Sequence, residues 1–218
     1  MPYYTMPDQE SLFVRRVGRG EPVLVLSGLG MQSWQWLPFI YANRKEYEFI
    51  IPDWRGFGGS KNCAIPEQDA ISSHWQDVAH LIEQLKLDKF ILMGYSMGAT
   101  TAMHGMKHAH LAQQLKAYLH IDQTPKISVD PTWQYGLFGP LHAQFKQLLN
   151  DIYQLLSIHK NAKYLYELSL PDRQKLVRLW VDFIELQSSN PFSPFVFKTA
   201  LKQPFLQKYL LPIQRLAF

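Results

Sequence analysis

The chain has 218 residues, of which 47% are hydrophobic and 14% aromatic. It can therefore bury a full core in one domain, or a core and a small appended one, which excludes a disordered or fibrous protein. The formal net charge is +4 at pH 7, but the lysines and arginines are scattered singly or in pairs, and this pattern argues against nucleic acid as a partner.

The cysteine content and the apolar runs indicate the compartment. Cys63 is the only cysteine, so no internal disulfide ties the chain to an oxidising environment. The first ten residues lack the basic start and apolar core of a secretion signal, and no apolar run approaches the roughly 20 residues of a membrane span. We expect a soluble, cytoplasmic protein without a membrane partner.

The first half of the chain alternates short apolar runs with amphipathic stretches, which is typical of a mostly parallel sheet with crossover helices. Strands are predicted at 12–17, 22–27, 48–52, 89–94 and 117–122. The "GRGE" turn at 18–21 predicts a hairpin between the first two, so the sheet should open with antiparallel strands. Apolar residues at helical spacing between 67 and 86 predict a crossover helix. The fold class is therefore α/β.

The pattern changes after the fifth of these strands. Residues 131–205 carry helical apolar stripes interrupted by prolines, which predicts a layer of short helices. We expect a core at 1–130, a helical cap at 131–205, and the start of a further core segment at 206–218.

Ser96 stands between two glycines where an apolar run passes into small, helix-compatible residues. A serine hydroxyl is a poor nucleophile and needs a sharp turn, a base, and backbone donors that receive negative charge. Gly94 and Gly98 permit such a turn, since a side chain at either position would strike a neighbouring element. The alternative is a strand-to-helix turn with an idle serine, but the flanking strand and helix favour the reactive serine.

Three segments together carry a resemblance to a known family. "GYSMGA" at 94–99 resembles the nucleophile elbow of the α/β-hydrolase family. "LSGLGM" at 26–31 resembles the loop after its third strand, and "DWRGFGGS" at 53–60 resembles its turn after the fourth strand. The resemblance covers about Leu12 to Pro125 and implies an α/β-hydrolase sheet covered by a helical cap.

The resemblance also implies roles for individual residues. Ser96 would be the nucleophile, and the backbone N–H groups of Leu29 and Met97 would form the oxyanion hole. The family usually has a histidine where this chain has Ser27, and that departure affects the shape of the loop more than the chemistry. No cofactor and no metal are implied.

The expected reaction is hydrolysis of an ester-like or other small apolar substrate through an acyl-enzyme. The aromatic residues of the cap could line an apolar pocket, and Trp133 and Phe138, which follow the fifth predicted strand most closely, are the first candidates for substrate contact. The alternative for any one of these rings is packing of the cap itself.

The acid and the base of a catalytic triad are harder to place. Asp122, at the end of the fifth predicted strand, is the best candidate for the acid, because some family members place their orienting carboxylate there; the alternative is a loop-capping aspartate. No histidine is a comparable candidate for the base, and His120 is expected to be a packed core residue. Beyond Gly139 there is no glycine, and beyond His159 no histidine.

We therefore expect a hydrolase truncated at its C-terminus, with its last strands missing. Two functional hypotheses follow: an active serine hydrolase, and a non-catalytic remnant that keeps the fold but lacks the base. The strand at 117–122 should then be an open sheet edge, and such an edge favours self-association.

The sequence also contains two patterns that resemble other kinds of site. "GLGMQS" followed by Asp53 imitates a dinucleotide-binding fingerprint, but Ser33 replaces its third glycine. His104 and His108 have metal-ligand spacing on a helix, yet no carboxylate or cysteine completes the set. The α/β-hydrolase interpretation accounts for more of the sequence than either.

Overall fold

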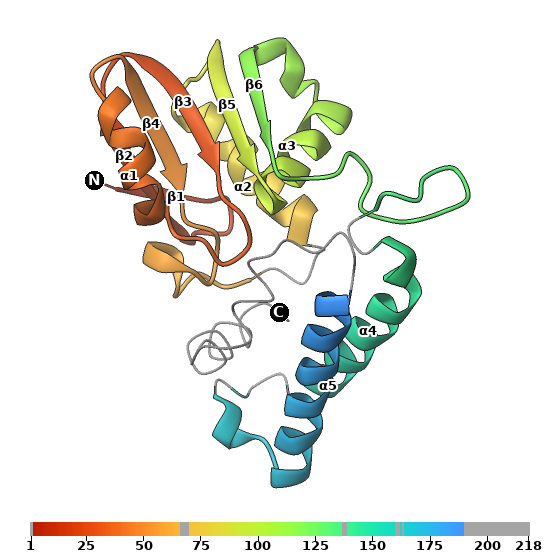
Figure 1. The fold of residues 1–218 in the computed structure, drawn as a ribbon. Coiled ribbons are helices and arrows are strands. Elements are labelled where there is room, and N and C mark those ends of the chain that lie inside the picture. Colours follow the sequence, from red (N-terminus) through yellow and green to blue (C-terminus); the bar gives the residue numbers. More distant parts are fainter. Residues whose placement is uncertain (1, 66–69, 137–138, 160–161, 163, 190–218) are drawn as a thin grey trace. The chain divides into compact units, whose positions relative to one another are not determined.

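A computed structural model describes residues 2–65, 70–136, 139–159, 162 and 164–189 (Figure 1). The chain divides into two compact units. The first ends at Pro125 and contains the sheet, and the second begins at Lys126. Each unit is described by itself.

The sheet of the first unit has six strands in the order β1-β2-β4-β3-β5-β6 (Figure 1). The strands are β1 (Tyr3–Thr5), β2 (Ser11–Gly18), β3 (Glu21–Leu26), β4 (Tyr47–Pro52), β5 (Phe90–Tyr95) and β6 (Leu115–Ile121). The first two pairings, β1 with β2 and β2 with β4, are antiparallel, and the others are parallel. The predicted class, a mostly parallel α/β sheet with an antiparallel start, is confirmed.

The hairpin predicted at 18–21 is wrong, because β4 lies between β2 and β3. The reason is the backbone that leads into β4, which lies against the turn: the amides of Arg19 and Glu21 donate to the carbonyls of Arg44 and Glu46. Gly20, with φ +114°, would place a Cβ only 2.1 Å from the Glu46 carbonyl oxygen. Because Gly20 has no side chain, the turn can lie directly against the backbone before β4, and β2 and β3 do not pair as a hairpin.

Helices cover both faces of this sheet (Figure 1). They are α1 (Leu37–Ile40), α2 (Ala70–Gln84) and α3 (Met97–His108). On the α1 face, Trp36 and Ile40 pack with strand residues such as Val25 and Met93 in one buried cluster. On the other face, α3 packs on β3 and β5 and also contacts α2. Burial of these apolar stripes supplies the main driving force for the layered arrangement.

Short 3-10 helices complete the first unit at Ser33–Trp36, Tyr41–Asn43, Gly58–Ser60 and Leu111–Gln114. The second unit has 3-10 helices at Gly139–Leu141 and Leu165–Glu167, and two longer helices, α4 (His142–Ile158) and α5 (Leu170–Ser189). Ile152 and Leu155 of α4 pack with Leu176 of α5 in a separate buried cluster. Over the described ranges, no helix is long and apolar enough to cross a membrane.

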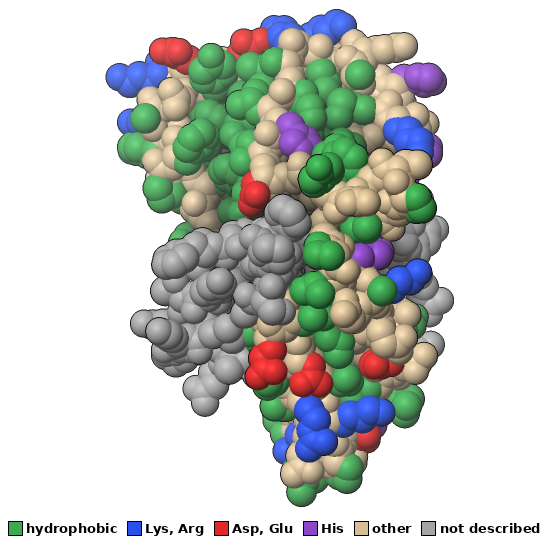
Figure 2. Space-filling model, turned by 45° about the vertical axis from the view of Figure 1, so that its right-hand side comes forward, with side chains coloured by type: hydrophobic (Ala, Val, Ile, Leu, Met, Phe, Trp, Pro, Cys, Tyr) green, Lys and Arg blue, Asp and Glu red, His purple; other side chains and the backbone are tan. Residues whose placement is uncertain are grey.

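The strand β6 lies at the edge of the sheet, with β5 as its neighbour among the described strands. Figure 2, in which the right-hand side of Figure 1 comes forward, shows exposed apolar side chains among polar ones on the first unit. Leu119 of β6 is 43% exposed. His120 is also exposed, so its predicted place in the core is wrong. The apolar run around it predicts a strand, but a strand at the edge of a sheet has a neighbouring strand on one side only, so its side chains are less covered than those of a central strand.

Candidate active site

Ser96 lies between the end of β5 and the first residue of α3, with φ 50° and ψ −118°. This conformation is rare for a residue with a side chain and costs about 1–3 kcal/mol. The surrounding hydrogen bonds hold it: the Ser96 amide donates to Ile121 of β6, and its carbonyl accepts from Ala99 and Thr100. The side chain of Ser96 makes no cap to the helix and is half-buried. These hydrogen bonds therefore hold Ser96 at a sharp turn in spite of the strain.

The two flanking glycines are required by close backbone contacts. A Cβ at Gly94 would lie 2.7 Å from Ala99 Cα, and a Cβ at Gly98 would lie 2.1 Å from the Leu26 carbonyl oxygen. Atoms cannot approach that closely, so α3 could not sit against β3 and β5 with larger residues there. The G-x-S-x-G pattern thus has the physical basis expected from the sequence.

The loop after β3 passes directly beside Ser96. A Cβ at Gly28 would lie 3.3 Å from Ser96 Cβ and 2.9 Å from Cδ1 of Tyr95. The next residue, Leu29, has an exposed side chain. Among the described residues, the amide hydrogens of Leu29 and Met97 have no hydrogen-bond acceptor. Two unpaired donors therefore belong to the two segments that meet at the serine.

Asp122 follows β6 immediately and has a left-handed backbone, with φ 52°. Burial raises the pKa of Tyr95, and the charge of Asp122 raises it further. Because the Ser96 amide is bonded to Ile121, the chain segment that carries Asp122 adjoins the elbow.

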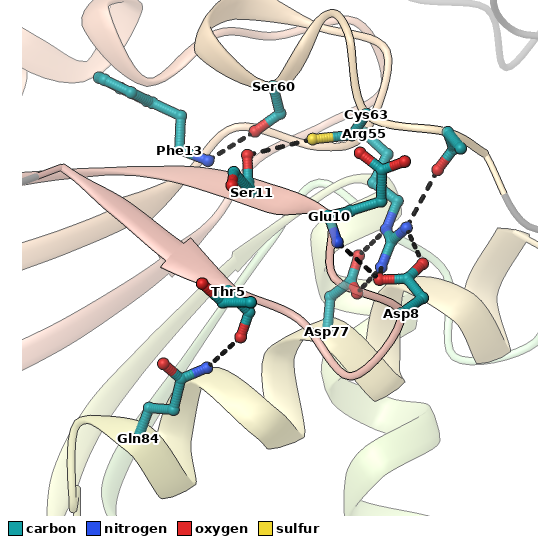
Figure 3. A network of polar contacts seen from close by, with 11 residues as sticks. Thr5, Asp8, Glu10, Ser11, Phe13, Arg55, Ser60, Cys63, Asp77 and Gln84 are labelled. Carbon is teal, nitrogen blue, oxygen red and sulfur yellow. Dashed lines mark hydrogen bonds and ion pairs between the residues drawn. The ribbon is translucent and has the colours of Figure 1, made fainter.

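The turn at 53–60 is organised by buried charges. The guanidinium of Arg55 forms two hydrogen bonds of 2.7 Å to Asp77 of α2 and is also bonded to Asp8 and to the carbonyl of Ala64 (Figure 3). The bonds to the two carboxylates raise the pKa of Arg55, and the Arg55 bond lowers the pKa of Asp8. This network joins the N-terminal strands to α2, and it has a structural role that the motif alone does not reveal.

Two of the described histidines, His120 and His159, form hydrogen bonds to groups other than the serine. The ring of His120 lies 2.9 Å from the Tyr118 hydroxyl and 2.7 Å from the Gln123 carbonyl. In the second unit, Nε2 of His159 lies 3.0 Å from the Asp172 carboxylate. Within the described ranges, Ser96 makes no hydrogen bond to a histidine. A base for Ser96 is therefore not identified among these residues, as the sequence also suggested.

Of the two residues proposed for substrate contact, Trp133 is half-buried. Its indole N–H donates to the Lys126 carbonyl at 3.0 Å, and its backbone pairs with Asp130. These bonds give Trp133 a part in folding the first segment of the second unit. Phe138 lies outside the described residues.

The residues of the two rival sites have other contacts in the structure. The carboxylate of Asp53 is 2% exposed and accepts hydrogen bonds from the amides of Ser33 and Gly59, so it does not face a nucleotide ribose. His104 and His108 lie side by side, with ring centroids 4.6 Å apart. Within the described residues, no group of three or more potential metal ligands is found.

Three features define the α/β-hydrolase class of fold: the strand order, the strained serine between β5 and α3, and the loop after β3 that passes beside this serine. Residues 21–214 match the family described as "alpha/beta hydrolase fold". The chain belongs to this family.

Similar proteins include esterases. Over 162 residues the chain is 27% identical to the pimeloyl-[acyl-carrier protein] methyl ester esterase of Legionella pneumophila strain Corby. The aligned segment covers 73% of this chain and 59% of that protein. It is 26% identical to the AB hydrolase superfamily protein YisY of Bacillus subtilis strain 168, over 97% of this chain and 77% of that protein.

Solved structures show the same fold. The esterase EaEST from Exiguobacterium antarcticum superposes with a TM-score of 0.57 at 22% identity, covering 83% of this chain and 67% of that one. A thermophilic esterase from Thermogutta terrifontis gives a TM-score of 0.54 at 23% identity, over 69% of this chain and 52% of that one. The chain thus spans between half and two thirds of these esterases.

Proposed function

We propose that this chain is, or is part of, a serine hydrolase that cleaves an ester-like or other small apolar substrate through an acyl-enzyme at Ser96. The observation that carries the proposal is the half-buried Ser96, held at φ 50° where two segments meet whose Leu29 and Met97 amides find no acceptor among the described residues. The similarity to esterases supports an ester bond as the target.

In the proposed reaction, the Ser96 oxygen forms a bond to the substrate carbonyl carbon while the carbonyl electron pair moves onto its oxygen. The amides of Leu29 and Met97 would donate hydrogen bonds to that oxyanion. Met97 begins α3, where amides lack intrahelical acceptors and the helix dipole favours negative charge. Loss of one such donor costs about 2.7–4 kcal/mol of transition-state stabilisation in other enzymes.

The intermediate then collapses, the bond from carbon to the leaving oxygen breaks, and water later releases the acid from Ser96. A base has to accept the serine proton and return it to the leaving group. We propose Asp122 as the carboxylate that orients this base, because it lies at the end of β6 beside the elbow. The alternative is a loop-capping aspartate.

Labelling with a fluorophosphonate probe tests the proposal, because the probe reacts with an activated serine. We expect the folded 218-residue chain to be labelled and Ser96→Ala to lose all labelling. Ser128→Ala, which removes an exposed serine hydroxyl in the second unit, is the matched control and should label like the parent. Absence of labelling in folded protein would contradict the proposal.

That negative outcome would support the second hypothesis, a remnant that keeps the fold without catalysis. The hydrogen bonds of His120 and His159 to other groups favour this second hypothesis, because no described histidine is hydrogen-bonded to Ser96. The dependence of the labelling rate on pH separates the two further. A histidine base gives an inflection between about pH 5 and 8.

The proposed partner is a small-molecule substrate, and the proposed location is the cytoplasm. The location rests on the single cysteine, Cys63, which is buried as a free thiol. A free cysteine is typical of reducing compartments. Cell fractionation with an antibody against the chain would test it.

A further inference from the structure

The loop between β3 and the 3-10 helix at Ser33–Trp36 carries Leu29 and is anchored at both ends by buried hydrogen bonds. We call residues 27–33 the glycine loop. At its start, the Ser27 hydroxyl accepts the indole N–H of Trp36, and the Ser27 carbonyl accepts that of Trp54, both at 2.9 Å. Ser27 is fully buried, so these bonds are shielded from water.

At the other end, Asp53 holds Ser33. The Ser33 amide donates to Oδ1 of Asp53 at 2.5 Å, and the Gly59 amide donates to Oδ2 at 2.8 Å. Both Asp53 and Ser33 are buried, with 2% and 0% exposure. A second contact at this end comes from Arg15 of β2, whose Nε donates to the Ser33 hydroxyl at 3.1 Å.

The space around the carboxylate is fitted to this arrangement. Gly58 has φ 50°, and a Cβ there would lie 2.1 Å from Oδ2 of Asp53. The turn at 53–60 therefore wraps closely around the carboxylate, which is aimed at the glycine loop. Charge-assisted bonds to backbone amides are short and strong in buried surroundings, so Asp53 ties the turn after β4 to the loop after β3.

From this geometry we propose that Asp53 is a positioning residue for the oxyanion hole: it fixes the glycine loop so that the Leu29 amide stays beside Ser96. The inference rests on the proposed function, because it assigns a purpose to the position of that amide. The Leu29 amide lies between the two anchors, four residues before Ser33, and Gly28 packs against the Ser96 side chain. A small displacement of the loop would therefore move the donor relative to the serine.

The first test compares Asp53→Asn with Asp77→Asn. The two carboxylates are buried to 2% and 3% exposure and lie in or against the same turn, but Asp77 bonds Arg55 and does not touch the glycine loop. In Asp53→Asn, one amide donor faces the new NH2 group and loses its acceptor. Misplacement of a reacting group by about 1 Å can cost about 100-fold in rate, so we expect labelling of Ser96 to slow by about 10- to 100-fold.

The second readout is hydrogen exchange of the peptide that covers residues 27–33, measured by mass spectrometry. Asp53→Asn should speed exchange there, whereas Asp77→Asn should leave this peptide unchanged even if it lowers the unfolding midpoint. In a parent chain that is labelled, equal labelling rates in the two variants would overturn the proposal, and unchanged exchange in Asp53→Asn would overturn it in any case.

Exchange also separates this inference from the proposed function. If the parent chain is not labelled but exchange responds only to Asp53→Asn, the anchor stands and the hydrolase proposal fails. If Asp53→Asn does not fold, Ser33→Pro replaces it, because proline removes the amide that donates to Asp53, and Gln32 before it is already extended at the start of a 3-10 helix. Faster exchange in residues 27–33 would then support the anchor, and unchanged exchange would refute it.

Discussion

The backbone of Ser96 makes a prediction that is independent of catalysis. At φ 50° and ψ −118°, glycine is free of the strain that any side chain suffers. We expect Ser96→Gly to be more stable than Ser96→Ala by about 1 kcal/mol, although glycine usually destabilises a fold relative to alanine. Urea unfolding of the two variants measures the difference.

Ser128 provides the matched comparison, since it is exposed and is not among the residues with positive φ. There the order should reverse, with the glycine variant less stable by up to about 1 kcal/mol. If alanine is also the more stable residue at position 96, the elbow is not strained, and the argument that strain presents the hydroxyl fails with it.

The same residues show what a sequence can and cannot predict of a site. Ser96 and its flanking glycines are found from the sequence because the turn imposes residue types at fixed spacing. The sequence places Asp53 in the DWRGFGGS turn and in a nucleotide-binding pattern but does not predict its role, because its partners, the amides of Ser33 and Gly59, are backbone groups that leave no trace in residue identity. Spacing reveals local geometry, whereas contacts to distant backbone need coordinates.

At the scale of elements, the ends of α4 and α5 are joined by polar contacts. Ser169, just before α5, donates its hydroxyl hydrogen to the Asp172 carboxylate at 2.6 Å and accepts the Asp172 amide. His159, just after α4, contacts the same carboxylate. The Ser169 bond, with a contribution from His159, lowers the pKa of Asp172.

This lowered pKa predicts a dependence of stability on pH. A carboxyl group whose pKa is lower in the folded state stabilises the fold above its unfolded value, about 4, and loses that effect as pH falls through the folded value. The parent chain should therefore exceed Asp172→Asn in urea midpoint by its full margin at about pH 5 to 6. The margin should shrink below pH 4.

Asp182→Asn, at an exposed position on the same helix, controls for the loss of a surface charge. A margin that is the same at pH 3 and pH 6 would mean that the Asp172 contacts contribute nothing to folding.

The strands themselves were predicted to within about two residues, because buried runs of apolar residues have clear ends. The order of the strands was not, since a run of apolar residues does not say which neighbour it pairs with. The contacts of residues 44–47 with the turn at 18–21 decide that β4 lies between β2 and β3. The three-residue β1 was missed because it is too short and too exposed to form a pattern.

At the scale of the whole molecule, the open edge of β6 has a consequence for association. Among the described strands only β5 pairs with it, and Leu119 is 43% exposed. Edges of this kind pair with strands of other chains, and lysine on an edge opposes such pairing. We expect the 218-residue chain to associate with increasing concentration, and Leu119→Lys to shift the equilibrium at least several-fold toward monomer.

Sedimentation equilibrium across a range of concentrations measures this shift. Leu149→Lys is the control, because Leu149 is 40% exposed but lies on α4. If both lysines weaken association equally, general charge repulsion explains the effect and the contact does not involve β6. A parent chain that stays monomeric at high concentration would show that the β6 edge is protected in solution, because unpaired strand backbone beside an exposed leucine would otherwise find a partner.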